Sequence, residues 1–591
     1  HLFADVLQAR LREEQPTQVA GLHQRASAWY EQQGQRTAAI RHALAAEDFT
    51  QVANLVELTW PELHRSTFRS PTLLAWLEAI PDELIRARPM LCVGYAWELL
   101  NGGEFEGAEV WLQAAERWLD NATTRVHSAA HPEILASAMI VMDQEEFRFF
   151  PAEVASARAY LAQVHGDVPG TVTYAQQALD FIPKDDYIRR GPAASLLGLA
   201  HWTIGNLEAA YQALAEGMDC FRRAGNIPFA ISGTFGMADI RIAQGRLHAA
   251  IGTYEQALQL AEKAGDLRLP GIADLHLGLS ELYREQGKRD AAAEHLRQSE
   301  ELGEQPGQPV YHYHHSLVQA RRAQEQGDLD GALRLLDEAE ERFLQVHIPD
   351  FQPVAARKAR VRIAQGQLTE ALAWARERAL AVDDEISYLR EFEHITLARV
   401  LIARYQREQH EESLRDAMRL LVRLLAAAEA GGRVGSVIEI LLLQALVDEA
   451  RGNLNAALVP LERALTLAQP EGYMYTFVDE GPAMAELLAT AAKAGIAPVY
   501  VSQLQAAFAE AALPEQQDAN VPASQNLIEP LSERELDVLR LLNTELSGPE
   551  IARKLIVSLN TVRTHTKSIY SKLGVNNRRA AVRRAEELDL C

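Results

Sequence analysis

Cysteine is scarce in this sequence of 591 residues, which has only Cys92, Cys220 and Cys591 and no pair in a CxxC spacing. Three isolated cysteines cannot build a disulfide scaffold, and their small number favours a reducing compartment, so we expect a cytoplasmic protein. The start of the chain also lacks the basic, apolar and small-residue segments of a signal peptide. Because the first residue is His1 rather than Met, we expect the chain to be a piece of a longer protein.

Long apolar runs are missing as well, although 48% of the residues are hydrophobic. This share is too high for a disordered chain, and charged residues interrupt it too often for a membrane span, so we expect no membrane partner. Runs that alternate apolar and polar residues between turn dipeptides are nearly absent, which argues against a sizeable sheet. Together these absences predict an all-α protein.

Motifs of catalysis and cofactor binding are absent too. The sequence has no HExxH, no Cys and His set with metal-ligand spacing, and no recognisable pairing of a nucleophile with a base. It also has no P-loop of the form GxxxxGKS or GxxxxGKT, since its only Gly-Lys pair, Gly287-Lys288, lacks the preceding glycine. We therefore expect no enzymatic activity and no cofactor in this segment.

The net charge of −23 hides a reversal near the C-terminus. Residues 531–591 hold eleven Lys and Arg against eight Asp and Glu, whereas the rest of the chain holds 47 against 73. Within this tail, residues 551–584 carry nine Lys and Arg and no acidic residue. A solvated helix surface is one interpretation of such a run, and a binding surface for a polyanion is the other.

One sequence motif recurs along the chain before the tail: a glycine, a mostly apolar position two residues later, an alanine three residues further, and then an apolar helix. It starts at Gly102, Gly205, Gly245, Gly287, Gly327, Gly366 and Gly452, with a variant at Gly166. From Gly205 to Gly366 the steps are 40, 42, 40 and 39 residues, and a degenerate copy, HEESLRDAMRLL, lies within the step of 86 residues to Gly452. This period predicts a superhelical array of stacked helical hairpins that resemble tetratricopeptide (TPR) repeats. Glycine would end the first helix with a positive φ, and alanine would let the second approach closely.

Arrays of this kind have concave surfaces that bind peptides, proteins or small molecules, so we expect an unidentified small-molecule or protein inducer on the repeats. One segment of the array is unusual, because His312 and His315 share a helix face within YHYHH at 311–315. A metal or ligand site is one interpretation of this segment. An aromatic-rich core helix with some histidines exposed is the favoured one.

The tail is large enough to fold as a small helical domain, 531–591, after a proline-containing linker at 513–530. Capping boxes at Ser532 with Glu535 and at Ser547 with Glu550 predict one helix through Leu542 and a second over 551–555. After a turn at 556–558, a third helix reaches about Leu573, and a fourth covers about 577–588. A short helix, a tight turn and a longer basic helix form a helix-turn-helix.

The third helix separates two kinds of side chain. At about 100° per residue, Val562, Ile569 and Leu573 form one buried stripe. The opposite face has no carboxylate and carries Asn560, Arg563, Thr564, Lys567 and Ser571. Such a face suits the major groove of DNA, because amide and cationic groups pair with base edges and phosphates. We therefore predict that the base-facing residues are Asn560, Arg563, Thr564 and Lys567.

The surroundings of this face give weaker predictions. Thr561 and Lys572 flank it and are placed at the DNA backbone, as is Arg578 at the start of the fourth helix. His565 lies beside the buried stripe, and we interpret it as structural. The fourth helix has a small apolar stripe that either pairs with a second copy or packs within its own domain, consisting of Ala581, Ala585 and Leu588.

The tail resembles the LuxR-type helix-turn-helix domain over residues 531–588, in the motifs LSERE, EIARKL, VSLNTVRTH and KLGVNNR. The resemblance implies that the third helix reads double-stranded promoter DNA and that the fourth forms a dimer contact. Carried over by position, it places Arg563, Thr564 and Lys567 at the bases, and Ser547, Thr561 and Lys572 at phosphates. Two positions depart from the family pattern. Glu545 replaces the usual Gly, which implies a different turn before the second helix, and Gly548-Pro549 replace the usual Asn-Lys, which removes one possible cationic contact with the DNA backbone. Neither departure touches the recognition face.

The rest of the chain resembles the C-terminal part of large MalT-like LuxR regulators, in HLFADVLQARLREE, LHQRASAWYEQQGQRTAAIRHALAAEDF and FVDEGPAMAELL. The resemblance implies that residues 1–14 end a winged-helix segment and that residues 15–512 are a TPR-like sensor, followed by the linker 513–530 and the domain 531–591. It also implies that ATP binds only to a domain that precedes this chain.

These observations favour a bacterial, sequence-specific DNA-binding transcription regulator whose repeats sense an inducer or partner. Promoter DNA is the expected partner, the regulator would be a dimer on DNA, and RNA polymerase would be a further partner. The alternative is a TPR-like scaffold whose repeats hold another protein and whose tail only docks.

Overall fold

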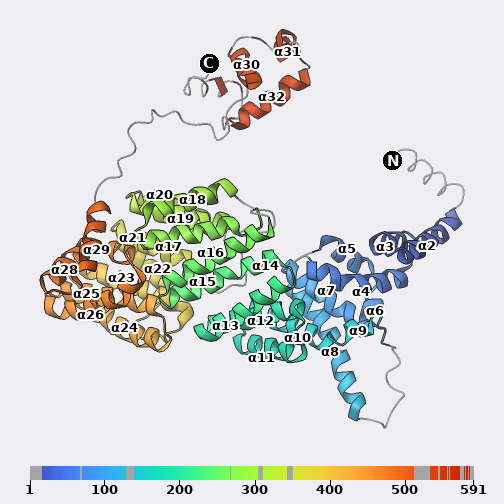
Figure 1. Ribbon diagram of the computed structural model, residues 1–591, viewed down its shortest axis with the longest axis horizontal. Helices are drawn as coiled ribbons and strands as arrows, with labels where there is room; N and C mark the ends of the chain where they lie inside the picture. Colours follow the sequence, from blue (N-terminus) through green and yellow to red (C-terminus); the bar gives the residue numbers. More distant parts are fainter. Residues whose placement is uncertain are drawn as a thin grey trace. The chain divides into compact units, whose positions relative to one another are not determined.

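The computed structural model describes residues 16–66, 70–127, 139–265, 268–303, 311–342 and 350–511, and in the C-terminal part 533–543, 546, 548–555, 557, 559–572, 575, 578, 581, 582 and 585. Every secondary-structure element in these residues is helical (Figure 1), so the predicted all-α fold is confirmed. The chain divides into two compact units, His1–Ala512 and Leu513–Cys591. The predicted winged-helix end at 1–14 and the linker at 513–530 lie outside the described residues.

Helical hairpins make up most of the first unit, which we call the repeat unit. The paired helices are α2 (Pro16–Gln32) with α3 (Arg36–Ala45), α7 (Pro89–Gly102) with α8 (Phe105–His127), α10 (Phe150–Val164) with α11 (Val168–Phe181), α12 (Tyr187–Thr203) with α13 (Leu207–Arg223), α15 (Thr234–Ala243) with α16 (Leu247–Ala264), α17 (Ile272–Glu285) with α18 (Arg289–Leu302), α19 (Tyr311–Glu325) with α20 (Leu329–Arg342), α21 (Val354–Ala364) with α22 (Leu368–Glu377), α23 (Glu391–Glu408) with α24 (Glu411–Ala430), and α25 (Val434–Ala450) with α26 (Leu454–Ala468). Shorter or single elements complete the unit: α4 (Phe49–Ser66), α5 (Pro71–Ala79), α6 (Asp82–Arg86), α9 (Gln144–Phe147), α14 (Ile227–Ser232), the 3-10 turns η1 (Tyr388–Arg390) and η2 (Gln469–Glu471), α27 (Tyr475–Val478), α28 (Pro482–Lys493) and α29 (Pro498–Ala511).

The turns between paired helices confirm the predicted repeats. The turn residues have φ between 70° and 81° at Gly103, Gly166, Gly205, Gly245, Gly287, Gly327, Gly366 and Gly452. The first of them is Gly103, one residue after the start of the motif at Gly102. In the degenerate copy Gln409 takes the same left-handed conformation, with φ 55°, and ends α23. The alanine five residues after the turn is fully buried at Ala108, Ala210, Ala250, Ala332, Ala371 and Ala457, as close helix packing requires.

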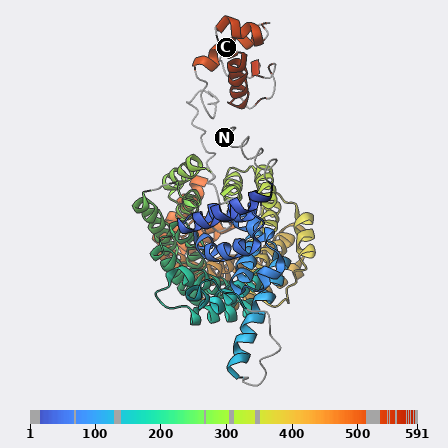
Figure 2. The ribbon, with the colours of Figure 1, turned by 90° about the vertical axis from the view of Figure 1, so that its right-hand side faces the viewer.

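Successive hairpins wind into a coil whose later part packs back onto its middle. Figure 2 looks along this unit from its N-terminal end, with the blue helices in front. A Cβ atom added to Gly245 would lie 2.8 Å from the side chain of Val434, and one added to Gly287 would lie 3.0 Å from Met474 Sδ. Helix α15 contacts α25, and α17 contacts α27. One hydrophobic cluster therefore extends from Ile231 to Leu504.

The C-terminal unit begins with three helices, α30 (Glu533–Leu542), α31 (Gly548–Leu555) and α32 (Leu559–Lys572). They lie where the sequence predicts them, except that α31 starts before the predicted residue Ile551. At the predicted fourth helix, the described residues 578, 581, 582 and 585 are helical. The core of the unit contains Val538, Leu539, Ile551, Val562 and Ile569, so the short helices share one hydrophobic cluster.

Candidate nucleic-acid interface

Helix α32 has an apolar side and a polar side. Val562 is 3% exposed and Ile569 is fully buried, which confirms this part of the predicted stripe. Leu573 lies outside the described residues. Thr564 and Lys567 are exposed on the opposite side of the helix. The helix therefore anchors one side in the hydrophobic core and presents hydrogen-bonding and cationic groups on the other.

For the remaining predicted base-facing residues, the structure describes only the helical backbone. Asn560 and Arg563 belong to α32, but their side chains lie outside the described residues, as does that of Ser571. Each of these residues lies four positions from Thr564 or Lys567, which puts its Cα atom on the same side of the helix. Ser547, a predicted phosphate contact, lies outside the described residues as well.

Two of the predicted DNA-backbone residues make contacts inside their own unit. Lys572 Nζ lies 3.0 Å from Glu535 Oε2, and the side chains are 13% and 6% exposed. Arg578 donates to the carbonyl oxygens of Leu542 and Leu546 at 2.9 and 2.7 Å. These cations therefore fasten α32 and the following segment to α30 and the turn after it. Thr561, another of the four predicted DNA-backbone residues, is half-buried.

Glu535 is the residue whose role the sequence analysis missed. The sequence places it in a capping box with Ser532, whereas its carboxylate accepts a hydrogen bond from Ser568 Oγ at 2.6 Å and pairs with Lys572. A sequence signal exists, because Glu535 shares a helix side with the buried Val538, Leu539 and Leu542. A carboxylate on the core side of a helix needs a partner from another helix.

The predicted apolar stripe of the fourth helix packs within its own unit. Ala581 and Ala585 are fully buried in the cluster that contains Val562 and Ile569. Their side chains are therefore not available to a second copy in this structure, which matches the second of the two interpretations. Leu588 lies outside the described residues.

The histidines singled out in the sequence lie on helices and are half-buried. His565 lies on α32, and His312 and His315 lie on α19 beside Tyr311, which is 5% exposed. His315 Nε2 lies 3.3 Å from Glu300 Oε1, a contact that the helix packing supplies. In the parts of the chain that the structure describes, no group of three or more His, Cys, Asp and Glu could hold a metal ion.

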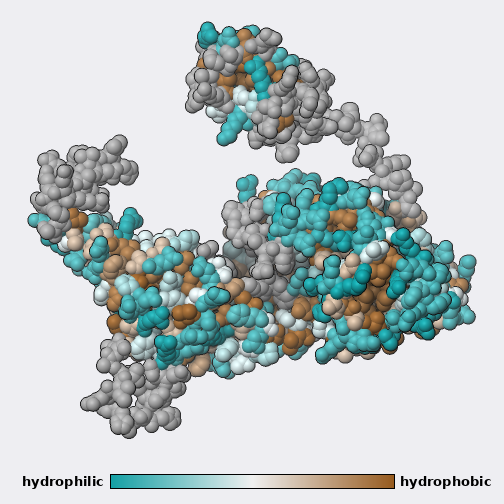
Figure 3. All heavy atoms as spheres, turned by 180° about the vertical axis from the view of Figure 1, so that it is seen from behind, coloured by the Kyte–Doolittle hydropathy of each residue, from teal (hydrophilic) through white to brown (hydrophobic). Residues whose placement is uncertain are grey.

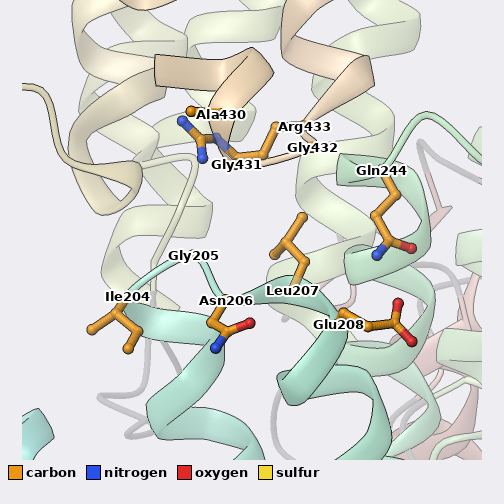
Figure 4. Close-up of a pocket in the computed structure, with 10 residues that line it drawn as sticks. All are labelled: Ile204, Gly205, Asn206, Leu207, Glu208, Gln244, Ala430, Gly431, Gly432 and Arg433. Atoms are coloured by element: carbon orange, nitrogen blue, oxygen red, sulfur yellow. The ribbon is translucent and has the colours of Figure 1, made fainter. Parts of the chain in front are cut away.

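The repeat unit has a cavity of about 640 Å³ at the meeting point of three repeat turns (Figure 4). Asn206 lines it from the turn before α13, and Glu208 from the first turn of α13. Gln244 lines it from the end of α15, and Arg433 from the turn before α25. The guanidinium group of Arg433 is occupied, since it donates to Glu391 at 2.6 and 2.8 Å. The hollow is open to solvent and joins turns that lie far apart in the sequence, with amide groups from Asn206 and Gln244 in its lining (Figure 4).

The surface of the repeat unit gives no sign of a large apolar face on the side drawn in Figure 3, where teal areas surround smaller brown ones. Among the described residues, no helix combines the length and the apolar character that a bilayer crossing requires.

Comparisons with known proteins agree with this organisation. Residues 152–494 match the family described as "MalT-like TPR region", and residues 529–585 match "Bacterial regulatory proteins, luxR family". The HTH-type transcriptional regulator MalT of Serratia proteamaculans (strain 568) is 26% identical over 608 residues. The protein of the same name from Yersinia pestis (strain Pestoides F) is 27% identical over 617 residues.

In both cases the match covers 99% of this chain and 64% of the relative, so the chain spans less than two thirds of these proteins. The solved structure of a Rap protein complexed with Competence and Sporulation Factor is 13% identical, with a TM-score of 0.42, and covers 65% of this chain and 98% of its own. Because the TPR match alone covers more than half of the sequence, this chain belongs to the MalT-like family of LuxR-type regulators.

Proposed function

We propose that this chain contains the sensor and the DNA-binding output of a bacterial transcription regulator that works in the cytoplasm. The C-terminal unit reads duplex DNA by placing α32 in the major groove, and the repeat unit binds an inducer or a protein partner. The observation that carries the proposal is the division of α32 into a buried apolar side at Val562 and Ile569 and an exposed side at Thr564 and Lys567.

Electrostatics supports this assignment. The segment 551–584 has nine basic residues and no acidic one, and a DNA-binding surface gains affinity by releasing counterions from phosphates. The relatives named above carry the description "HTH-type transcriptional regulator". Any ATP-dependent step would belong to the part of those relatives that this chain does not span.

The residues of the interface fall into two groups. Asn560, Arg563, Thr564 and Lys567 face the bases, while Ser547 and Thr561 contact phosphates. Lys572 and Arg578 act through the fold, because both already bind protein groups that hold α32 in place. A dimer on DNA and a contact with RNA polymerase belong to the same proposal, and the dimer contact lies outside Ala581 and Ala585.

The test uses the full chain and a duplex that the chain itself selects from a random pool. Binding to this duplex and to an unrelated one is measured over a series of salt concentrations. Arg563→Ala should lose roughly 1–3 kcal/mol on the selected duplex and relax the preference at one base pair. Lys493→Ala, which removes an exposed cation from the repeat unit, is the control and should change neither.

Equal losses on both duplexes would remove the base-reading role of Arg563. If the chain shows no preference among duplexes and the repeats capture a protein partner, the scaffold alternative replaces the proposal.

A further inference from the structure

Several helices of the repeat unit turn one side toward the axis of the coil. Arg360 on α21 lies 2.8 Å from Glu439 on α25, two hairpins later. Arg284 on α17 lies 3.2 Å from Asp479, the residue after α27. Both contacts start from the first helix of a hairpin and end on an element much later in the chain, so these helix sides face one another across the coil. We call this side of α17, α21, α23 and α25 the inner face.

Carboxylates on the inner face are shared between cations. Glu439 Oε1 lies 2.8 Å from Arg360 Nη1 and also 2.8 Å from Arg399 Nη2. Arg399 has a second partner, Glu480, at 2.5 Å. Arg321 on α19 pairs with Glu281 at 2.9 Å. Arg399 is therefore fully neutralised, whereas Arg360 has only part of one carboxylate.

Arg360 also keeps a donor without an acceptor. Its Nε donates to Thr396 Oγ1 at 2.9 Å, and its guanidinium carbon lies 3.8 Å from the ring centre of Phe392. Its Nη2 atom is buried and has no hydrogen-bond partner among the described residues. A buried donor of a cation that makes no hydrogen bond costs free energy, so an acceptor supplied from outside the chain would be favourable.

Arg357 lies one helical turn before Arg360, on the same side of α21. Its guanidinium group donates to the backbone oxygen of Gln352 at 3.3 Å and to its side-chain oxygen at 2.5 Å, and both acceptors are neutral. Within the described parts of the chain, Arg357 forms no ion pair, and part of its surface is open to solvent. Burial and the neighbouring Arg321 lower the pKa of Arg357, although the carboxylates of Glu281 and Asp350 oppose the shift. Burial lowers the pKa of Arg360 to about 10 against the effect of Glu439.

We propose that Arg357 and Arg360 bind the anionic group of a small ligand, a carboxylate or a phosphate, on the inner face of the repeats. Guanidinium groups recognise both anions with parallel hydrogen bonds, and two of them on one helix side present several donors together. The inference rests on the proposed sensor role of the repeats, because it names the chemical class of the inducer. It predicts binding whether or not DNA is present.

The experiment titrates the full chain with inorganic phosphate and, separately, with succinate, followed by calorimetry at constant ionic strength set with chloride. Heat from phosphate alone assigns a phosphate ligand, and heat from succinate alone assigns a carboxylate ligand. Arg357→Gln should weaken the binding about tenfold or more, since it removes charge-assisted hydrogen bonds. This variant breaks no ion pair and removes only the two hydrogen bonds to the exposed Gln352, so its thermal unfolding temperature, measured in parallel, should fall only slightly.

Arg362→Gln is the matched control, because it removes the same charge from another side of α21. Arg360→Lys is a second variant that keeps the charge beside Glu439 but removes the unpartnered donor, and it should also weaken binding. The proposal is overturned if neither anion binds better than chloride, or if Arg362→Gln weakens binding as much as Arg357→Gln. Duplex binding is measured in parallel, so a failure here leaves the DNA-reading proposal standing.

Discussion

Both units of this chain bury paired cations, but the C-terminal unit also exposes a cation on the helix that we propose to read DNA. In the repeat unit, several arginines meet carboxylates from other hairpins. Arg433 pairs with Glu391 at 2.6 Å, and the two side chains are 7% and 4% exposed. In the C-terminal unit, Lys572 is paired in the same manner, whereas Lys567 on the same helix is exposed. Whether a cation stabilises the fold or can meet DNA therefore depends on where its side chain points and which group it contacts, not on the number of charges in the segment.

This comparison also separates two sources of stability. The winding of the repeats depends on buried ion pairs and on close contacts between distant turns, such as Gly245 with Val434. The helix-turn-helix depends on a small apolar cluster and on one buried carboxylate, Glu535. Substitutions that affect one source and spare the other test the distinction.

The largest effect is expected for Arg433→Ala. It leaves the buried carboxylate of Glu391 without its cation, which should lower the free energy of unfolding of the repeat unit by about 3–5 kcal/mol. Urea denaturation followed by far-UV circular dichroism measures the change. Arg463→Ala removes an arginine from an exposed pair with Glu429 and should cost less than about 1 kcal/mol. Equal losses for the two variants would show that burial of the pair is irrelevant.

Gly245→Ala should have the next largest effect, about 2–3 kcal/mol. Part of the cost is the left-handed backbone, with φ 76°, and part is the close approach of the new Cβ to Val434. Gly327→Ala is the control, because Gly327 has φ 77° and no atom within 4 Å of an added Cβ. It should therefore cost only the backbone part, about 1–2 kcal/mol. The difference between the two losses measures how tightly the coil closes on itself.

Asp239 on α15 offers a test by pH. Desolvation by the surrounding helices raises the pKa of its carboxyl group to about 6, although the residue keeps an exposed surface and His314 and Arg357 oppose the shift. A carboxyl whose folded pKa lies above its unfolded value binds its proton more tightly in the folded chain, so stability falls as pH rises from about 4 to about 6. Asp239→Asn should remove this loss and exceed the parent chain at pH 7 by only about 1 kcal/mol, because the side chain is exposed and solvent screens its charge. The advantage should vanish at pH 4, and an advantage of the same size at both pH values would contradict the prediction.

The sequence alone predicts the parts of this fold that depend on local requirements. The repeat turns follow from glycine, because a left-handed residue must end each first helix, and even Gln409 occupies that place in the degenerate copy. The stripe of Val562 and Ile569 follows from helical periodicity in the same way. The contact of Gly245 with Val434 was not predictable, because it results from the small rotation that each hairpin adds to the next.

The candidate site shows the same limit. A lysine at the flank of a recognition helix has two chemically equal partners, a phosphate or a carboxylate of its own domain. The choice at Lys572 depends on Glu535, which lies 37 residues earlier in the sequence. The burial of Ala581 and Ala585 likewise depends on how the last helix packs, and alanine carries little information about its partner.

The smallest effects should come from the two lysines of α32, and they sharpen the comparison within one helix. Lys572→Ala leaves Glu535 buried without its cation and should destabilise the C-terminal unit by about 1–2 kcal/mol, seen as faster hydrogen exchange in α30 and α32. Lys567→Ala should change that stability by less than about 0.5 kcal/mol, because its side chain is exposed. It should instead reduce the salt dependence of duplex binding by about one counterion, because an exposed cation at the groove acts on phosphates. If Lys567→Ala destabilised the unit and left the salt dependence unchanged, the polar side of α32 would be a structural surface rather than the one that meets DNA.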